Sequence, residues 1–173
     1  MVGLSLARSA RTMTAVDSSR AAVFAARLAA VVNRVPVDVL HGDLFEPVGG
    51  RTFDVIVSNP PYLPTPEGAR APGSRAWDGG HDGRSILDRL CREAPAHLRP
   101  GGELFVVQSS LAGTEQTLTM LGDAGLRSSV AAVHLGPLGP QARSQAPHLR
   151  AIGVLPGAAV EDIVVVRARH GPG

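Results

Sequence analysis

An apolar run leads directly into Asn-Pro-Pro-Tyr at residues 59–62, and this junction restricts the folds that the chain can adopt. The run contains Val55, Ile56 and Val57 in succession, a β-branched pattern typical of a parallel strand that is buried on both faces. The two prolines that follow lack backbone N–H groups, and they bias Asn59 away from helical geometry. The pattern therefore predicts a buried strand that ends in a stiff turn, with Asn59 at its carboxyl end.

Ligands of open α/β sheets bind at the carboxyl ends of the strands, so this turn is a candidate binding site. The side-chain oxygen of Asn59, together with the backbone carbonyl of Ser58 or Pro60, could accept both hydrogens of a planar NH2 group. The ring of Tyr62 could pack on the flat face of the same group. The alternative is a proline-rich exit from a strand with a buried tyrosine and no function beyond the turn.

Two motifs resemble those of a known family: Asn59-Pro60-Pro61-Tyr62-Leu63-Pro64, and then Trp77-Asp78-Gly79-Gly80-His81-Asp82-Gly83. The first is similar to the signature of class I S-adenosylmethionine-dependent methyltransferases that act on adenine, cytosine or glutamine amide nitrogens. Together they resemble the HemK-type protein-glutamine methyltransferases, which modify translation release factors. The resemblance runs from about Thr12 to Arg169 and is specific at these two motifs.

The resemblance implies an α/β fold. Its Rossmann-like sheet would have the strand order 3-2-1-4-5-7-6, with an antiparallel last strand. It also implies methyl transfer from S-adenosylmethionine to a planar amide nitrogen, with Asn59, Pro60, Pro61 and Tyr62 forming the catalytic turn. The expected partner is a release-factor-like protein with an exposed glutamine. Adenine amino-methylation of DNA or RNA is the enzymatic alternative, because the same four residues could receive a flipped base.

Composition limits the class of protein further. The 173 residues are 44% hydrophobic, which suits one domain spanning 1–173. All 17 basic residues are arginines, they face 15 acidic residues, and no basic run suggests a nucleic-acid groove. The single cysteine, Cys91, and six scattered histidines predict neither a disulfide nor a metal site. No stretch has the roughly 20 apolar residues of a membrane span and no signal peptide is evident, so we expect a soluble cytoplasmic protein.

Residues of the N-terminal third are candidates for cofactor binding. A strand over Thr12–Val16 ends at Asp17, and a helix is expected from Ser18 or Ser19 to Val32. Acidic residues at such strand ends accept ribose hydroxyls in dinucleotide folds. The resemblance gives Asp17 this role and places Ser18 beside it; the alternative is that Asp17 caps the helix.

A second strand, Val37–Leu40, leads to Asp43, Leu44 and Phe45. By the resemblance, Asp43 contacts the adenine amino group, and the backbone N–H of Leu44 meets a ring nitrogen. Asn59 would also border the cofactor. Phe45 is expected to pack in the core rather than to stack on the adenine.

The C-terminal half is predicted to contain a loop, two helices and three further strands. Residues 63–82 are rich in proline and glycine and are expected to form a loop on the substrate side, in which Trp77 either walls a pocket or anchors the loop. Predicted elements are a helix over Ser85–Leu98 with Cys91 in the core, a turn at Pro100–Gly102, a strand over Leu104–Val107 and a helix over Thr114–Ala124. The strands Val130–Leu135 and Ile163–Val166 are expected to form a terminal antiparallel pair joined by a long excursion rich in proline, glycine and arginine.

The family's first strand and glycine-rich cofactor loop have no counterpart in this sequence and would precede Met1, while Met1–Ala10 is expected to be part of a helix. We therefore expect an N-terminally incomplete domain in which the flanking strands have unpaired edges, so that the chain aggregates and binds S-adenosylmethionine weakly. The alternative is a degenerate, non-catalytic relative that binds a partner protein.

Overall fold

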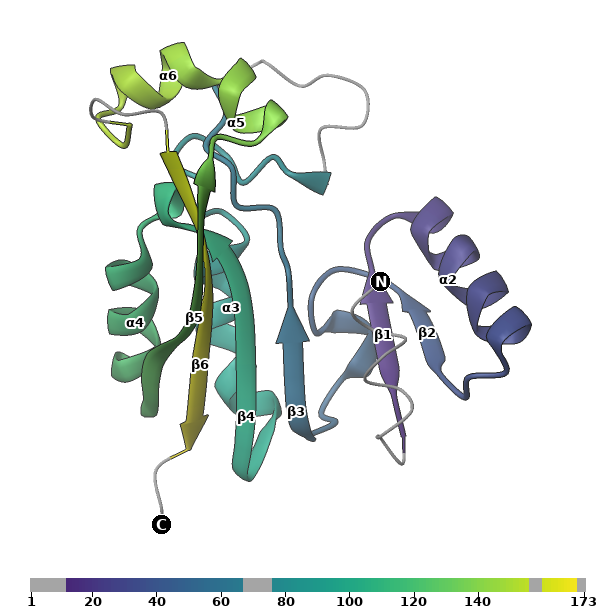
Figure 1. Ribbon diagram of the computed structural model, residues 1–173. Helices are drawn as coiled ribbons and strands as arrows, with labels where there is room; N and C mark the ends of the chain where they lie inside the picture. Colours follow the sequence, from purple (N-terminus) through teal and green to yellow (C-terminus); the bar gives the residue numbers. More distant parts are fainter. Residues whose placement is uncertain (1–11, 67–75, 156–159, 171–173) are drawn as a thin grey trace. The chain divides into compact units, whose positions relative to one another are not determined.

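The computed structural model describes residues 12–66, 76–155 and 160–170. The helix expected at Met1–Ala10 and the middle of the proline-rich loop lie outside these ranges. The chain forms two compact units, residues 1–51 and 52–173, which are described separately below (Figure 1).

The first unit is a strand, a helix and a parallel strand. Strands β1 (Thr14–Asp17) and β2 (Asp38–His41) pair in parallel, helix α2 (Arg20–Asn33) connects them, and a short 3-10 helix η1 (Glu46–Val48) follows. Helix α2 begins where it was predicted, because the hydroxyl of Ser19 caps it by accepting the N–H of Ala22 at 3.3 Å.

The second unit contains a four-stranded sheet in the order β3-β4-β6-β5 (Figure 1). Its strands are β3 (Phe53–Ser58), β4 (Leu98–Ser109), β5 (Leu126–Pro137) and β6 (Val160–His170). Strand β3 is parallel to β4, whereas β6 is antiparallel to both of its neighbours. The predicted order is confirmed within each sheet, including the antiparallel last strand.

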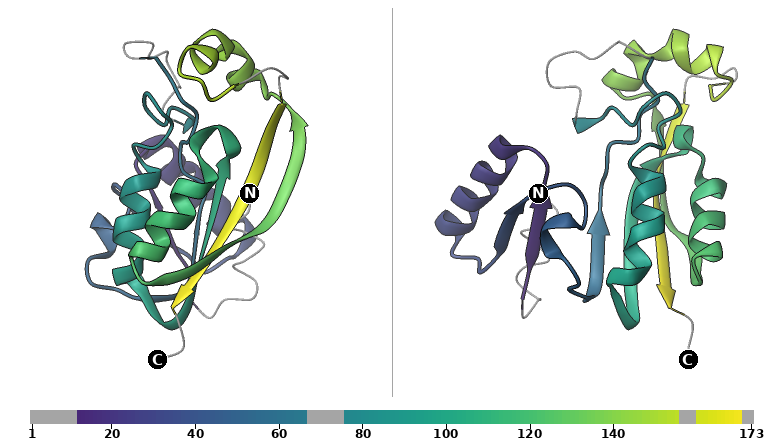
Figure 2. Two further views of the ribbon diagram at one scale, coloured as in Figure 1. Left: turned by 90° about the vertical axis from the view of Figure 1, so that its left-hand side faces the viewer. Right: turned by 180° about the vertical axis from the view of Figure 1, so that it is seen from behind.

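The helices of this unit are α3 (Leu87–Glu93), α4 (Thr114–Asp123), α5 (Pro140–Ser144) and α6 (Ala146–Ala151), with 3-10 turns η3 (Ala94–His97) and η4 (Ser110–Ala112). Helices α3 and α4 lie on one face of the sheet, and α5 and α6 lie beyond the ends of β5 and β6 (Figure 2). Leu104, Val106 and Val166 are fully buried, as expected for side chains that face α3 and α4.

The other face of this sheet departs from the prediction that β3 is covered on both sides. Val55 and Val57 remain 52% and 41% exposed. Among the described residues of this unit, α3 and α4 cover the opposite face, so alternate side chains of β3 have no covering helix. The apolar run predicted the strand correctly, but it did not predict that two of its valine side chains stay exposed.

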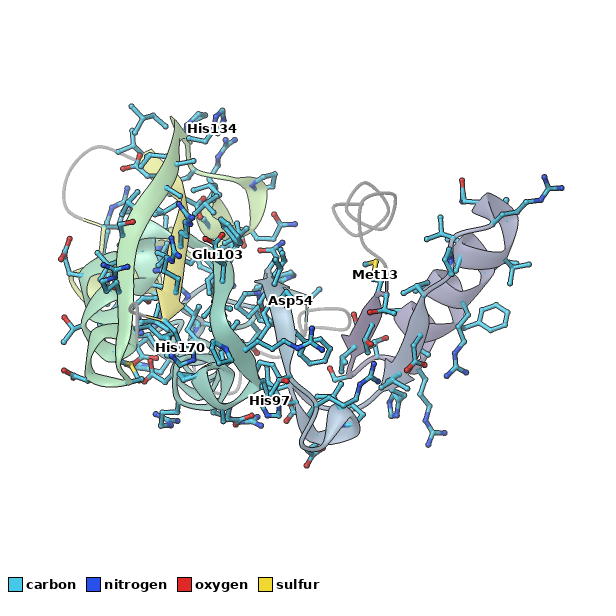
Figure 3. The ribbon with its side chains drawn as sticks, turned by 90° about the horizontal axis from the view of Figure 1, so that it is seen from below. Met13, Asp54, His97, Glu103, His134 and His170 are labelled. Atoms are coloured by element: carbon cyan, nitrogen blue, oxygen red, sulfur yellow. The ribbon has the colours of Figure 1, made fainter. Side chains whose placement is uncertain are left out.

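Two of the ion pairs involve the first half of β3 and β4, away from the end of β3 that carries Asn59. Arg99 pairs with Asp54 at 2.7 Å, and Arg167 pairs with Glu103; Figure 3 labels both acids, on the neighbouring strands β3 and β4. The hydrogen bond from Arg167 lowers the pKa of the Glu103 carboxyl. Exposed pairs of this kind contribute little to stability, because water and salt screen the attraction between the charges.

Two local predictions needed correction, and one segment whose secondary structure the sequence left open is helical. Pro100–Gly102, expected as a turn, belongs to β4, and the pairing of β3 with β4 shifts register between Phe53 and Val55 to accommodate it. Helix α3 is shorter than predicted, since its last turn continues as η3 around Pro95. The excursion before β6 is helical, with Pro140 and Pro147 in the first turns of α5 and α6, where proline is tolerated.

Candidate active site

The Asn-Pro-Pro-Tyr turn directly follows β3, as the sequence predicted. Asn59 is exposed, Pro60 is buried, and Pro61 and Tyr62 are half-buried. Because Ser58 is in parallel register with Val106 of β4, the turn leaves the carboxyl ends of two adjacent parallel strands. The structure therefore presents the Asn59 amide at the edge where open α/β sheets bind ligands.

The chain after Tyr62 is fixed by a short parallel bridge to the second motif. The N–H of Leu63 donates to the carbonyl of Trp77, and the N–H of Gly79 donates to the carbonyl of Leu63, both at 2.9 Å. The N–H of Thr65 donates to Gly80 at 2.8 Å. The two sequence motifs are thus brought together although nine residues between them lie outside the described part of the chain.

Gly83 packs against the backbone of the turn. A Cβ atom at this position would lie 2.4 Å from the carbonyl oxygen of Tyr62, and the φ angle of Gly83 is +79°. Both the space and the left-handed backbone require glycine. The sequence indicated only that this glycine bends the chain, and it gave no sign that the residue touches Tyr62.

Arg84 is a buried residue that sequence reasoning missed. Its side chain donates to the carbonyls of Ala112 and Gly113, at 2.5 and 3.0 Å, and pairs with Asp88 at 2.8 Å. These bonds connect the second motif to η4 and the start of α4. They also offset the free-energy cost of desolvating the guanidinium group. Burial of an arginine immediately after Gly83 could not be read from the sequence, because arginines are mostly exposed.

A hydrophobic cluster joins the turn to α5 and α6. Its buried members are Leu63, Leu111, Leu138, Ala142, Ala146, Leu149 and Leu155. Trp77 packs against this cluster and is half-buried, which supports the interpretation of Trp77 as an anchor for the loop. His148 of α6 also contacts the second motif, since its ring meets the carbonyl of His81 at 3.1 Å and the His81 ring edge-on.

Tyr62 shares its surroundings with a buried carboxylate. The side chain of Glu161, at the start of β6, is 9% exposed and accepts the N–H of Gly139 at 3.1 Å. Burial is the main reason that the pKa of Tyr62 is raised, and the negative charge of Glu161 raises it further.

The predicted cofactor residues lie in the first unit, at the carboxyl ends of its two strands. Asp17 and His41 are in register at the ends of β1 and β2, so Asp17 and the segment after His41 lie at the same edge of the sheet. Asp17 is exposed, and its Oδ1 accepts the N–H of Ser19 at 2.7 Å. The helix cap is Ser19, so the alternative reading of Asp17 as the cap is wrong.

Ser18, Asp43 and Leu44 complete this group. The carbonyl of Ser18 lies 3.1 Å from Nε2 of His41, which connects the two strand ends. Asp43 is half-buried, and Leu44 has a φ angle of +45°. A left-handed leucine costs on the order of 1 kcal/mol, and such strain is commonly found at ligand sites. Asp17, Ser18, Asp43 and Leu44 belong to one unit, and Asn59 to Tyr62 belong to the other.

Neither a cluster of metal ligands nor a membrane-spanning helix occurs in the described ranges. Those residues hold no group of three or more histidine, cysteine, aspartate or glutamate side chains able to bind a metal ion. No helix within them is long and apolar enough to cross a lipid bilayer.

The parallel-then-antiparallel sheet, with its Asn-Pro-Pro-Tyr turn at the carboxyl edge, is that of a class I Rossmann-like methyltransferase. The structure of E. cuniculi Mtq2 with Trm112, described as responsible for methylation of the eRF1 termination factor, superimposes with a TM-score of 0.54 at 17% identity. That match covers 98% of this chain and 93% of the other.

Sequence comparison is more specific. Residues 1–71 match the family model Methyltransferase small domain. The chain is 41% identical over 127 residues to the "Putative protein N5-glutamine methyltransferase" of Methanocaldococcus jannaschii, over 72% of this chain and 64% of that protein. It is 39% identical over 114 residues to the release factor glutamine methyltransferase of Geobacter sulfurreducens. That match covers 62% of this chain and 39% of that protein. The predicted resemblance is confirmed: the chain is similar to protein N5-glutamine methyltransferases, and it spans less than two thirds of the length of these two relatives.

Proposed function

We propose that this chain carries the substrate-binding and much of the cofactor-binding machinery of an S-adenosylmethionine-dependent enzyme that methylates a glutamine side-chain nitrogen. The expected substrate is a protein with an exposed glutamine, such as a release factor. The observation that carries the proposal is the exposed Asn59 amide on a turn whose backbone is fixed by Gly83 and by the bridge between Leu63 and Trp77.

An amide nitrogen is a poor nucleophile because its lone pair is delocalised. The side-chain oxygen of Asn59 and the carbonyl of Ser58 or Pro60 would accept both N–H groups of the substrate amide, which favours a pyramidal nitrogen and orients its lone pair. Pro60 and Pro61 keep this turn from rearranging. No base is needed before attack, since the nitrogen becomes far more acidic once it is alkylated.

The residues of the first unit fit the cofactor that this reaction requires. Asp17 offers a carboxylate at a strand end for ribose hydroxyls, and Asp43 and the strained Leu44 follow the neighbouring strand. S-Adenosylmethionine would supply an electrophilic methyl group. Asp43 would accept a hydrogen bond from the adenine amino group, and the N–H of Leu44 would donate to the ring.

Replacement of Asn59 tests the proposal. Asn59→Ala should lower methyl transfer to a release-factor-like protein on the order of a hundredfold or more, as expected when a hydrogen bond of the transition state is lost. Stability and cofactor affinity should hardly change, because Asn59 is exposed. Asn33→Ala, at the only other asparagine of the sequence, is a matched control that should keep full activity.

The readout is transfer of labelled methyl to protein containing an exposed Gly-Gly-Gln loop, compared with the same protein carrying Gly-Gly-Ala and with duplex DNA and RNA. Label on glutamine that disappears in Asn59→Ala supports the proposal. Label on adenine would favour the nucleic-acid alternative, and activity of Asn59→Ala equal to that of Asn33→Ala would reduce the motif to a structural turn.

A further inference from the structure

The stretch from residue 124 to residue 160 contains no aspartate or glutamate, since all 15 acidic residues of the chain lie outside it. It carries three arginines, and two of them, Arg143 and Arg150, lie on the helices α5 and α6. The helical region of residues 138–155 is called the basic cap below. Neither the fold nor the proposed reaction uses its charge, and surface charge of one sign attracts partners of the other sign.

The basic cap lies at the edge of the sheet that carries Asn59. Strand β5 is antiparallel to β6, β6 is antiparallel to β4, and β4 is parallel to β3. The carboxyl ends of β3 and β5 therefore lie at the same edge of the sheet. Helix α5 begins at Pro140, shortly after β5 ends at Pro137, and Figures 1 and 2 show α5 and α6 beyond this edge.

Contacts attach the cap to the Asn-Pro-Pro-Tyr turn. The residue after Tyr62, Leu63, shares a buried cluster with five side chains of the cap: Leu138, Ala142, Ala146, Leu149 and Leu155. On α6, Nε2 of His148 lies 3.1 Å from the carbonyl oxygen of His81 in the second motif. The cap is therefore held beside the turn on which the substrate amide is proposed to bind.

The two arginines of the cap are on its outer side. Arg143 and Arg150 directly follow the buried residues Ala142 and Leu149, and both are exposed. Arg143 donates through Nη2 to the carbonyl of Leu138 at 3.1 Å, which restrains its guanidinium group. Within the described ranges, neither arginine forms an ion pair.

Carboxylates of the neighbouring segments bind elsewhere. Asp78 and Asp82 of the second motif each accept a backbone N–H of their own segment, at 3.0 and 2.9 Å. Glu161, at the start of β6, accepts the N–H of Gly139 at 3.1 Å. The guanidinium groups of the cap are thus left to bind a carboxylate from another molecule.

We propose that the basic cap binds an acidic segment of the protein substrate and so holds a neighbouring glutamine at the Asn-Pro-Pro-Tyr turn. A guanidinium group forms two parallel hydrogen bonds with a carboxylate, which makes arginine well suited to this contact. Nucleic acid fits less well, because its phosphate backbone is followed by runs or stripes of basic residues. The inference rests on the proposed function for the acceptor glutamine, whereas binding of an acidic peptide is measured without methyl transfer.

The variants remove one charge at a time and then both. Arg143→Gln and Arg150→Gln are made singly and together. Arg127→Gln is the matched control, because Arg127 is an exposed arginine of the same acid-free stretch but lies near the start of β5, at the opposite edge of the sheet. Urea unfolding verifies that each variant of the full chain is folded.

The first readout is the binding of labelled peptides by fluorescence anisotropy. One peptide has Gly-Gly-Gln flanked by aspartates, and the other has the same sequence flanked by asparagines. The aspartate peptide should bind more tightly, and the double variant should weaken its binding about threefold to tenfold at low salt, the range for exposed charge pairs. Arg127→Gln should bind it as the wild type does.

The effect should disappear in about 1 M salt, where the screening length is about 3 Å. Equal binding of the two peptides, or unchanged binding in the double variant, overturns the proposal. An RNA oligonucleotide that binds more tightly than the aspartate peptide, and that depends on the same arginines, overturns the assignment to a protein segment.

The second readout is kinetic, with a Gly-Gly-Gln protein that carries acidic residues beside the loop. The KM for this protein should rise in the double variant by a similar factor, while kcat stays close to that of the wild type, because the arginines act in binding and not in the chemical step. A lower kcat at unchanged KM would contradict the docking role.

Failure of the proposed function gives a different result. If the aspartate peptide binds in an arginine-dependent manner and no protein is methylated, then the acidic docking stands and the assignment of glutamine methylation fails. If methylation proceeds equally well without Arg143 and Arg150, then the proposed function stands and the docking role fails.

Discussion

Gly83→Ala is the substitution for which the structure gives the most definite expectation. The new Cβ would lie 2.4 Å from the carbonyl oxygen of Tyr62 and 3.0 Å from Cδ of Pro64, and the backbone would have to keep a φ angle of +79°. The left-handed conformation costs an alanine about 1–2 kcal/mol. The overlap is with backbone, which cannot swing aside as a flexible side chain would, and overpacking of this kind costs roughly 1–3 kcal/mol more.

Gly125→Ala provides the matched control, because Gly125 has a φ angle of +83° in the same unit and a Cβ there would have no atom within 4 Å. Its cost should be the conformational part alone, about 1–2 kcal/mol. Urea unfolding of both variants, followed by the fluorescence of the single tryptophan, measures the two free energies of unfolding.

Gly83→Ala should therefore be destabilised by about 2–5 kcal/mol in total, and its methyl transfer should fall sharply because the displaced atom belongs to the proposed catalytic turn. Gly125→Ala should retain its activity wherever it remains folded. Equal stabilities of the two variants, or full activity of Gly83→Ala, would refute the inference that Gly83 holds the turn in place.

The other predictions concern the cofactor residue Asp17, the hydrophobic cluster that contains Leu149, and the buried thiol of Cys91. Asp17→Ala should weaken S-adenosylmethionine binding by about 1.5–3 kcal/mol in calorimetry, the range for a hydrogen bond to a charged group, and unchanged binding would remove the ribose assignment. Leu149→Ala, at a side chain of α6 with no exposed surface, should lower the free energy of unfolding by about 2–5 kcal/mol, and a smaller loss would mean that the cluster contributes little. Burial raises the pKa of the Cys91 thiol from 9.0 to about 11. The folded state then retains a proton that the unfolded state releases, so the contribution of Cys91 to stability should be full below about pH 9 and be lost between pH 9 and 11, and the alkaline decline should be smaller in Cys91→Ala.

Much of the second unit could be predicted because its signals are local. The β-branched residues of β3, the two prolines and the apolar spacing of α3 and α4 determine where strands, turn and helices occur. Ser19 likewise marks the start of α2 through its own hydroxyl. The position of Asn59 at a strand end follows from this local information, and the family resemblance followed from the same residues.

Contacts between distant segments were decided only by the tertiary structure. The approach of Gly83 to Tyr62, the burial of Arg84 against Ala112 and the hydrogen bond between Glu161 and Gly139 all involve partners more than 20 residues apart in the sequence. Nothing in the local sequence indicates them, because a glycine, an arginine or a glutamate has the same chemistry in solvent as in a packed interior. What changes is the space and the dielectric around each one, and the fold sets both.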